Sequence, residues 1–153
     1  MKDERVVVYL IDKNSNQVCY LRKNHGPKFL IDKLVGFGGK IEPEDLDKDK
    51  TTMILNAVKR ELKEEIEDNL GINIDLKNLE FIYQGILYED NIVVHILKAI
   101  ISVKIPQGLI RSEGEIIYKP ITYHQTNSSE FPPNDKHWLN KLFFTNKFFE
   151  YRT

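Results

Sequence analysis

The chain has 153 residues, 41% of them hydrophobic and 10% aromatic, with 22 basic and 23 acidic side chains, which suits one globular domain over residues 1–153. The charge balance excludes the global basic field that is typical of nucleic-acid binders. The single cysteine, Cys19, excludes a disulfide within the chain, is typical of a reducing compartment and is expected to be buried and unreactive. The apolar run Val6–Ile11 is too short for a signal peptide or a membrane span. We therefore expect a cytoplasmic protein without a membrane partner.

Two short, β-branched runs open the chain. Val6–Ile11 and Val18–Leu21 are predicted to be strands, joined by a turn at Asn14–Asn16. Arg22 and Lys23 end the second strand. Two adjacent cations at a strand end either contact phosphate groups of a substrate or face solvent, and the sequence leaves both readings open.

A glycine-rich segment precedes the longest predicted helix. Residues 24–35 are predicted to be irregular, and Gly36–Gly39 to form a tight loop. Paired glycines let the backbone approach a ligand closely, and the flanking Lys40 suits a phosphate group. This loop is therefore a candidate phosphate-binding element.

The central helix is predicted from Thr52 to Leu70, with Thr51 or Thr52 as its N-cap and Gly71 as its stop. One face carries apolar residues at steps of four, which is the stripe that a helix buries: Ile54, Val58, Leu62 and Ile66.

Another face of this helix carries four carboxylates at positions i, i+3, i+4 and i+7: Glu61, Glu64, Glu65 and Asp68. Such a face is either solvated, with ordinary pairs such as Arg60 with Glu64, or it holds a cation. Like charges at this spacing repel one another, and a divalent cation with oxygen ligands relieves the repulsion. The glycine pair upstream favours the metal site.

Two long apolar runs, Leu79–Leu87 and Ile92–Val103, predict a second hairpin with its turn at Tyr88–Asn91. His95 lies inside the second run, and a lone histidine in a strand is more often a packing residue than a ligand.

The remaining third of the chain predicts one strand and one helix. An acidic turn, Arg111–Glu115, leads into a strand at Ile116–Tyr118. The last element is a helix from Asn134 or Asp135, as its N-cap, to about Phe149. Its apolar side chains are assigned to the core: Trp138, Leu139, Leu142, Phe143 and Phe148.

The central segment resembles the Nudix box. The match lies at six positions: Gly39, Arg60, Glu61, Leu62, Glu64 and Glu65. Asp45 stands where the box has its first glutamate, and fourteen residues separate it from Arg60 instead of seven. The extra loop is Leu46–Thr52, and a second addition of about one helical turn follows Glu65. Both additions lie outside the part of the helix that carries the three glutamates.

This resemblance implies an α+β fold, an α/β/α sandwich. A mixed, partly antiparallel sheet would lie between the box helix and the C-terminal helix. It also implies a metal-dependent hydrolase of a nucleoside diphosphate linked to another group. Mg²⁺, for which Mn²⁺ may substitute, would be held by carboxylates and one carbonyl: Glu61, Glu64, Glu65, Glu115 and Gly39.

The resemblance also suggests individual roles. Glu64 or Glu115 would be the general base, with Glu113 as the second choice to Glu115 in the acidic turn. Arg60 belongs to the catalytic set and would orient a helix carboxylate. Three cations, namely Lys40, Arg22 and Lys23, could hold the phosphates.

The downstream half is similar, in order and spacing, to the oxidised-purine nucleoside triphosphate pyrophosphohydrolases of the MutT-like branch, enzymes that clean the nucleotide pool. By that resemblance Asp135, and more weakly Asn134, are candidate base contacts, although plain helix capping explains them equally well. Val35 and Pro132 stand where that branch has an asparagine and a tryptophan.

Two other functions stay open. A Nudix enzyme could act on dinucleoside polyphosphates, ADP-ribose or a capped RNA end, although an RNA substrate should require a basic groove that this composition does not indicate. The fold could also be a non-catalytic nucleotide-binding module, but the complete set of three box glutamates argues against this.

Overall fold

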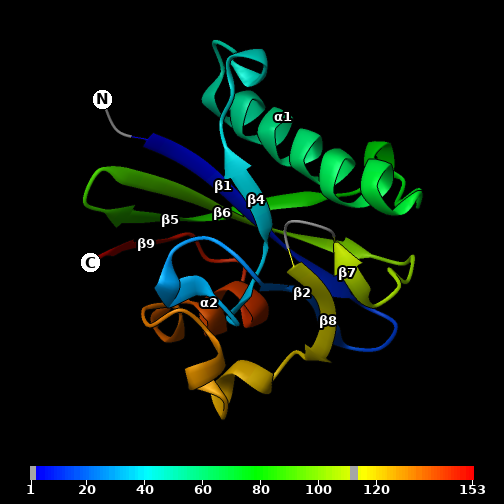
Figure 1. Cartoon of the computed structure of the whole chain (residues 1–153). Helices are drawn as coiled ribbons and strands as arrows, with labels where there is room; N and C mark the ends of the chain where they lie inside the picture. Colours follow the sequence, from blue (N-terminus) through cyan, green and yellow to red (C-terminus); the bar gives the residue numbers. More distant parts are fainter. Residues whose placement is uncertain (1–2, 111–113) are drawn as a thin grey trace.

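The computed structural model describes residues 3–110 and 114–153, and in this part of the chain nine strands form one sheet (Figure 1). The strands are β1 (Asp3–Asp12), β2 (Gln17–Lys23), β3 (Leu34–Val35), β4 (Phe37–Lys40), β5 (Phe81–Glu89), β6 (Ile92–Ile101), β7 (Gly108–Ile110), β8 (Gly114–Pro120) and β9 (Phe149–Arg152). Their order is β7-β8-β2-β1-β6-β5-β9, with β3 paired to β2 and β4 paired to β1.

The sheet is mixed, as the sequence predicts. The parallel pairs are β1 with β6 and β5 with β9, and the other pairs are antiparallel. Both predicted hairpins are confirmed, because β1 pairs with β2 and β5 pairs with β6. The turn of the second hairpin is shorter than predicted, since the strands extend to Glu89 and Ile92.

The prediction of a loop at Gly36–Gly39 was wrong for most of its length, because Phe37–Lys40 forms strand β4 against β1. The glycines explain this strand. A Cβ atom on Gly38 would lie 1.9 Å from the carbonyl oxygen of Val6, so only glycine lets β4 lie this close to β1.

The central helix begins at Lys50 as α1 (Lys50–Leu62) and continues as a π-helix over Lys63–Asp68. Helical structure ends at Leu70, and Gly71 follows with a φ of +69°. The stop is therefore confirmed. The predicted N-cap was wrong: the carboxylate of Asp49 accepts the Thr52 N–H at 3.0 Å. The predicted stripe is fully buried.

The prediction of one long C-terminal helix was also wrong. The chain forms a 3-10 helix at Asp135–His137, α2 (Leu139–Phe144) and then β9. Two buried side chains of the sheet, Gln84 and Lys98, donate to carbonyl oxygens at the end of α2, including that of Thr145. Phe149 then packs on Gly85, where a Cβ atom would lie 2.3 Å from the ring, so β9 can pair with β5.

The two helices lie on opposite faces of the sheet, which confirms the α/β/α sandwich (Figure 1). Beneath α1, the buried core contains Val6, Val8, Leu10, Cys19, Leu21, Phe37, Leu97 and Tyr118 together with the helix stripe. On the α2 face it contains Tyr9, Tyr20, Ile96, Phe131, Trp138, Leu142, Phe143 and Phe149. None of the helices in the described ranges is long and apolar enough to cross a membrane.

Two sequence predictions concern single buried residues, Cys19 and His95. Cys19 is fully buried, and burial raises the pKa of its thiol to about 12, which keeps it protonated and unreactive. His95 is 1% exposed and packs in the sheet, where it hydrogen-bonds with Tyr83 and Glu4. Both predictions are confirmed.

Candidate active site

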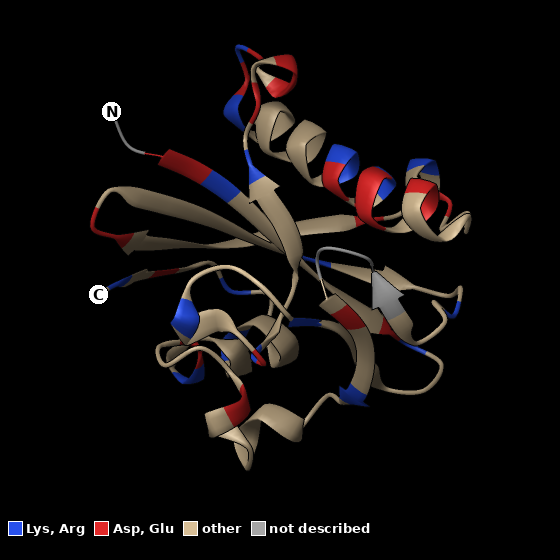
Figure 2. Ribbon diagram, in the orientation of Figure 1, with Lys and Arg blue, Asp and Glu red and all other residues tan. Residues whose placement is uncertain are grey.

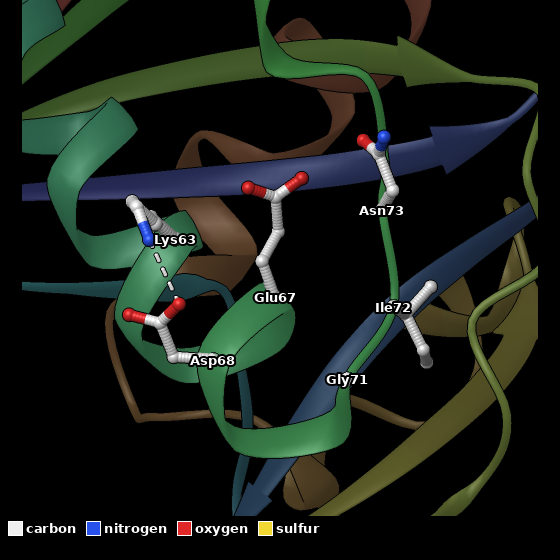
Figure 3. Close-up of a pocket in the computed structure, with 6 residues that line it drawn as sticks. All are labelled: Lys63, Glu67, Asp68, Gly71, Ile72 and Asn73. Atoms are coloured by element: carbon white, nitrogen blue, oxygen red, sulfur yellow. Dashed lines mark hydrogen bonds and ion pairs between the residues drawn. The ribbon is translucent and has the colours of Figure 1, made fainter.

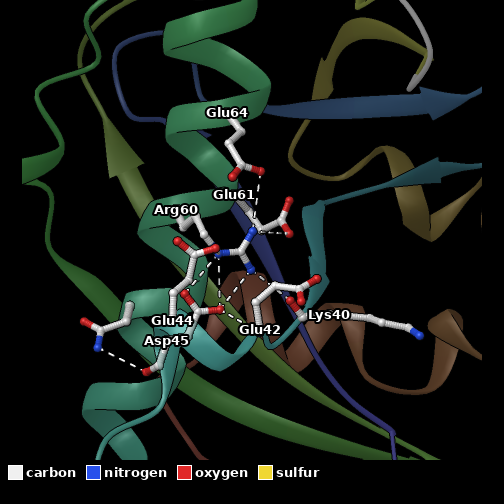
Figure 4. Close-up of polar contacts among 8 residues, drawn as sticks. Lys40, Glu42, Glu44, Asp45, Arg60, Glu61 and Glu64 are labelled. Carbon is white, nitrogen blue, oxygen red and sulfur yellow. Dashed lines mark hydrogen bonds and ion pairs between the residues drawn. The ribbon is translucent and has the colours of Figure 1, made fainter.

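Arg60 lies at the centre of a polar cluster beside α1 (Figure 4). Its guanidinium binds Asp45 through Nε (3.0 Å to Oδ1) and Nη2 (2.9 Å to Oδ2), and Nη2 also donates to the Lys40 carbonyl at 2.9 Å. Asp45 is buried and accepts a further hydrogen bond from the Glu42 N–H at 2.8 Å. Burial alone would raise the pKa of Asp45, but the hydrogen bonds from Arg60 and Glu42 outweigh it and lower the pKa.

The same guanidinium reaches the carboxylates of the helix. Arg60 Nη1 lies 3.2 Å from Glu61 Oε1 and 3.4 Å from Glu64 Oε2. Arg60 therefore joins three parts of the chain: the loop at Asp45, the end of β4 at Lys40, and the helix. This geometry agrees with the expectation that Arg60 orients a helix carboxylate.

The carboxylate of Glu61 lies against the backbone of Gly39. A Cβ atom on Gly39 would be 2.4 Å from Glu61 Oε1, so any side chain there would displace this carboxylate. Burial raises the pKa of Glu61, the Arg60 charge opposes this, and the Glu64 charge adds to it. Glu65 is 9% exposed and hydrogen-bonds with Glu61, whereas the Glu64 side chain is 55% exposed.

These residues have the donor chemistry that Mg²⁺ requires. Across residues 3–110 and 114–153, no three carboxylate, imidazole or thiol groups converge on one point. The carboxyl groups of the half-buried Glu61 and the buried Glu65 nevertheless lie side by side, next to the backbone of Gly39. Carboxylate oxygens are hard donors that suit a divalent cation, with Glu64 at the exposed edge.

The structure does not bring Glu115 into this cluster. Glu115 is exposed on β8, where its neighbours across the sheet are Arg22 and Leu109. It shares a face of the strand with Ile117, which packs on the α2 side, whereas Ile116 packs beneath α1. Glu113 lies outside the described residues.

The three candidate phosphate-binding cations lie apart from one another. The Lys40 side chain is 58% exposed, lies 3.9 Å from Asp3 and extends away from the Arg60 cluster (Figure 4). Arg22 binds the Asp32 carbonyl and the Glu130 carboxylate on the α2 face. Lys23 ends β2 and is half-buried.

Asp135 lies in an aromatic environment on the α2 face. It is 7% exposed, and burial together with the charge of Glu89 raises its pKa well above the usual range. Burial, and then the Asp135 charge, raise the pKa of Tyr20, and Trp138 meets Tyr9 edge to face at 5.9 Å. Asn134 precedes Asp135 and, within the described chain, its side chain makes no capping hydrogen bond.

Sequence reasoning missed the two tyrosines of this environment, Tyr9 and Tyr20. Within the described chain, the Tyr20 hydroxyl and the Trp138 Nε1 are buried without a hydrogen-bond partner. Buried tyrosine and tryptophan usually find a partner, so these groups are two unpaired polar atoms in an otherwise apolar part of the core. The available signal was a tyrosine inside each of the two N-terminal aliphatic runs.

Solved structures of low sequence similarity share this architecture. The chain is similar to the MutT protein of Bacillus halodurans, with 18% identity, a TM-score of 0.69, and coverage of 98% of this chain and 89% of that chain. A NUDIX hydrolase of Alicyclobacillus acidocaldarius has 12% identity, a TM-score of 0.63 and coverage of 96% and 93%. The chain has the Nudix fold. No protein-family model matches the sequence, and neither does any curated protein.

A third structure of this Nudix group is the dihydroneopterin triphosphate pyrophosphohydrolase of E. coli. It has 13% identity, a TM-score of 0.60, and coverage of 92% of this chain and 94% of that chain. At these identities the comparison shows the fold alone.

The second addition to the Nudix box overlaps the π-helical segment Lys63–Asp68. A shallow depression of about 370 Å³ lies beside it (Figure 3), lined by Lys63, Glu67, Asp68, Gly71, Ile72 and Asn73. Lys63 pairs with Asp68 at 2.8 Å, and Glu67 accepts the Ile74 N–H at 3.1 Å. These polar groups largely satisfy one another, so we place the active site at the Arg60 cluster.

Proposed function

We propose that the chain is a metal-dependent Nudix hydrolase that cleaves a nucleoside diphosphate linked to another group. The observation that carries the proposal is the Glu61 carboxylate seated on Gly39 and joined through Arg60 to Glu64 and Asp45. This arrangement buries several charges next to the backbone of Gly39, and burying charges costs free energy. A module that only binds a nucleotide does not need it.

The residues divide the chemical work. Glu61, Glu65 and the Gly39 carbonyl would hold Mg²⁺ or Mn²⁺, and Glu115, which lies on the other side of the sheet, has no part in this site. When bound, the metal would neutralise phosphate oxygens and lower the pKa of the attacking water. Glu64 would accept the proton from that water, since its exposed carboxylate can reach solvent. Arg60 would keep Glu61 and Glu64 oriented throughout.

We further propose a nucleoside triphosphate as the substrate, hydrolysed to the monophosphate and pyrophosphate. One structural neighbour, the E. coli dihydroneopterin triphosphate pyrophosphohydrolase, supports a triphosphate. The Asp135 environment supports a nucleobase site. Burial raises the pKa of Asp135 and so favours its protonated form, which would offer both a donor and an acceptor to a base edge.

The test is product analysis with a panel of nucleotides and Mg²⁺. We expect pyrophosphate from normal or oxidised purine triphosphates, and its loss in Glu64→Gln. Asp68→Asn is the matched control, because Asp68 lies on the same helix but pairs with Lys63. Activity confined to ADP-ribose, dinucleoside polyphosphates or capped RNA would replace the substrate assignment. Nucleotide binding without hydrolysis of any panel member would overturn the proposal of an enzyme.

A further inference from the structure

Arg22 forms the centre of a contact on the α2 face that the hydrolytic chemistry does not use. Its Nη1 donates to the Asp32 carbonyl at 2.9 Å, and its Nη2 binds Glu130 Oε1 at 3.2 Å. The other oxygen of Glu130 accepts the Tyr123 hydroxyl. Lys33 donates to the Ser129 carbonyl at 2.6 Å. We call these four side chains, Arg22, Lys33, Glu130 and Tyr123, the latch.

The latch lies on the face opposite the Nudix helix. Along β2, Cys19 and Leu21 pack in the core beneath α1, whereas Val18 and Tyr20 pack on the α2 side. Because strand side chains alternate, Arg22 points to the α2 side with Tyr20. Its guanidinium is therefore on the other side of the sheet from the Glu61 and Glu64 carboxylates.

The latch joins two segments that border the Asp135 environment. The first is the β2–β3 connection, residues 24–33, which enters the sheet next to Gly36, whose backbone hydrogen-bonds with the Tyr9 hydroxyl. The second segment runs from Ser128 to Asp135. Phe131 in this segment meets the Tyr20 ring at 5.4 Å.

The second segment is short and stiff between the latch and Asp135. Five positions separate Glu130 from Asp135, and Pro132 and Pro133 lie between them, each with a fixed φ. The Asp135 N–H donates to the Pro132 carbonyl at 3.0 Å, which closes the turn. A displacement of Glu130 is therefore passed along the backbone to Asp135 instead of being absorbed by a flexible loop.

We propose that Arg22 is a positioning residue for base selectivity and not a phosphate ligand. Through Glu130 it holds the 128–135 segment, and with it Asp135, in the position at which Asp135 would contact the nucleobase. The role rests on the proposed function, since it concerns the nucleoside end of the same substrate. It corrects the reading of Arg22 and Lys23 as one pair of phosphate contacts.

The experiment compares Arg22→Ala, Glu130→Gln and the double variant, with Arg5→Ala as control. Arg5 also forms an ion pair, at 3.0 Å, but its partner Asp3 is two residues away. Steady-state kinetics use purine and pyrimidine triphosphates, with tripolyphosphate as a substrate without a nucleoside. We expect each single variant to raise KM for the preferred nucleotide about tenfold, with kcat little changed and the purine-to-pyrimidine ratio altered. The double variant should be no worse than either single one, because both break the same contact.

A phosphate ligand would behave differently. In that case Arg22→Ala would lower kcat/KM by the same factor for every nucleotide and for tripolyphosphate, while Glu130→Gln would have no effect. That result would overturn the positioning role.

A second readout does not depend on hydrolysis. Trp138 is the one tryptophan of the chain, is 2% exposed and lies three residues after Asp135. Arg22→Ala and Glu130→Gln should both increase acrylamide quenching of its fluorescence, with Arg22→Lys intermediate and Arg5→Ala unchanged. Unchanged quenching in both latch variants would overturn the latch even if the chain hydrolyses triphosphates. If quenching increases in both latch variants but the chain has no activity, the latch stands and only the proposed function is overturned.

Discussion

Beneath α1, the polar side chains of the candidate site bind partners that are close in sequence. On the α2 face, the polar side chains bind partners that are far away in sequence. Asp45, Arg60, Glu61 and Glu64 all lie within twenty positions of one another. Arg22 and Glu130 are 108 positions apart, and Lys98 reaches Thr145 across 47 positions. Figure 2 shows charged residues gathered along the second half of α1 and in the loop before it.

This difference separates two tasks. A cluster built from one segment keeps its geometry wherever that segment folds, which suits chemistry that every substrate needs. Contacts between distant segments depend on the whole sheet being assembled. We infer that changes in the Arg60 cluster alter catalysis for all substrates, whereas changes in contacts between distant segments alter stability and selectivity. Four predictions test this separation.

The largest expected effect is on the exposed carboxylate of the Nudix helix. Glu64→Gln keeps the size of the side chain but removes its charge, and we expect kcat to fall by about 10² to 10⁴ for every substrate. The thermal midpoint should be unchanged because Glu64 is 55% exposed. Stopped assays of pyrophosphate release and differential scanning fluorimetry measure the two quantities. A fall restricted to one nucleotide would contradict a role in the common chemistry.

The next effect concerns the glycine under Glu61. Gly39→Ala places a Cβ atom 2.4 Å from Glu61 Oε1, so the carboxylate must move. We expect Mg²⁺ to activate the variant with an affinity about 10 to 100 times lower than that of the unaltered chain. Titrating Mg²⁺ against initial rate measures the change. If the dependence of the initial rate on Mg²⁺ were unaltered, metal activation would not require the position that the Glu61 carboxylate has against Gly39.

On the α2 face, Lys98→Met should lower stability instead of catalysis. Lys98 is 5% exposed, and its ammonium donates to the carbonyls of Leu142 (2.6 Å) and Thr145 (2.8 Å). The variant leaves helix carbonyls without this donor, which costs about 1 to 3 kcal/mol of the free energy of unfolding. Urea unfolding measures this change in the free energy of unfolding. A variant as stable as the original would mean that the hydrogen bonds only offset the cost of burying the cation.

The smallest effect is a pH dependence of stability from His95. Its Nε2 lies 3.0 Å from Glu4 Oε2 and its Nδ1 lies 2.7 Å from the Tyr83 hydroxyl. Burial lowers the pKa of His95 below 6.5, against the opposing effect of Glu4. The unfolded chain therefore takes up the proton first. As the pH falls from 6.5 through the folded-state pKa, the free energy of unfolding decreases.

We expect His95→Gln to remove part of this slope, less than about 1 kcal/mol between pH 6.5 and pH 5. Part of the slope should remain, because burial also lowers the pKa of His124. Urea unfolding at several pH values measures it. An identical slope in the variant would show that His95 takes up its proton equally in both states.

The sequence predicted the segments whose signals are local. The four-residue steps of Ile54, Val58 and Leu62 and the stop at Gly71 identified the helix. The regular α-helical spacing expected for the three glutamates was not found, because Glu64 and Glu65 lie in the π-helical segment. Asp49 was missed as the cap because two threonines follow it, and the hydroxyl of Thr52 itself donates to Asp49.

The errors lie where a distant residue decides the local structure. Phe149 continues the apolar pattern of the predicted helix, but Gly85 on β5 provides the space that lets its segment form a strand. The partner of Arg22 is equally distant, because Glu130, 108 positions away, binds its guanidinium. Neither partner can be identified from the spacing of neighbouring residues.

The most direct test of this division compares the rates of two variants on the same set of nucleotides. Glu65→Gln, from the carboxyl pair, and Asp135→Asn, from the aromatic environment, are each assayed with Mg²⁺ on purine, oxidised purine and pyrimidine triphosphates. We predict that Glu65→Gln lowers kcat by a similar factor for all of them, and that Asp135→Asn changes the ratio of kcat/KM between bases. A uniform loss in Asp135→Asn together with a base-dependent loss in Glu65→Gln would contradict the assignment of chemistry to the α1 face and selectivity to the α2 face.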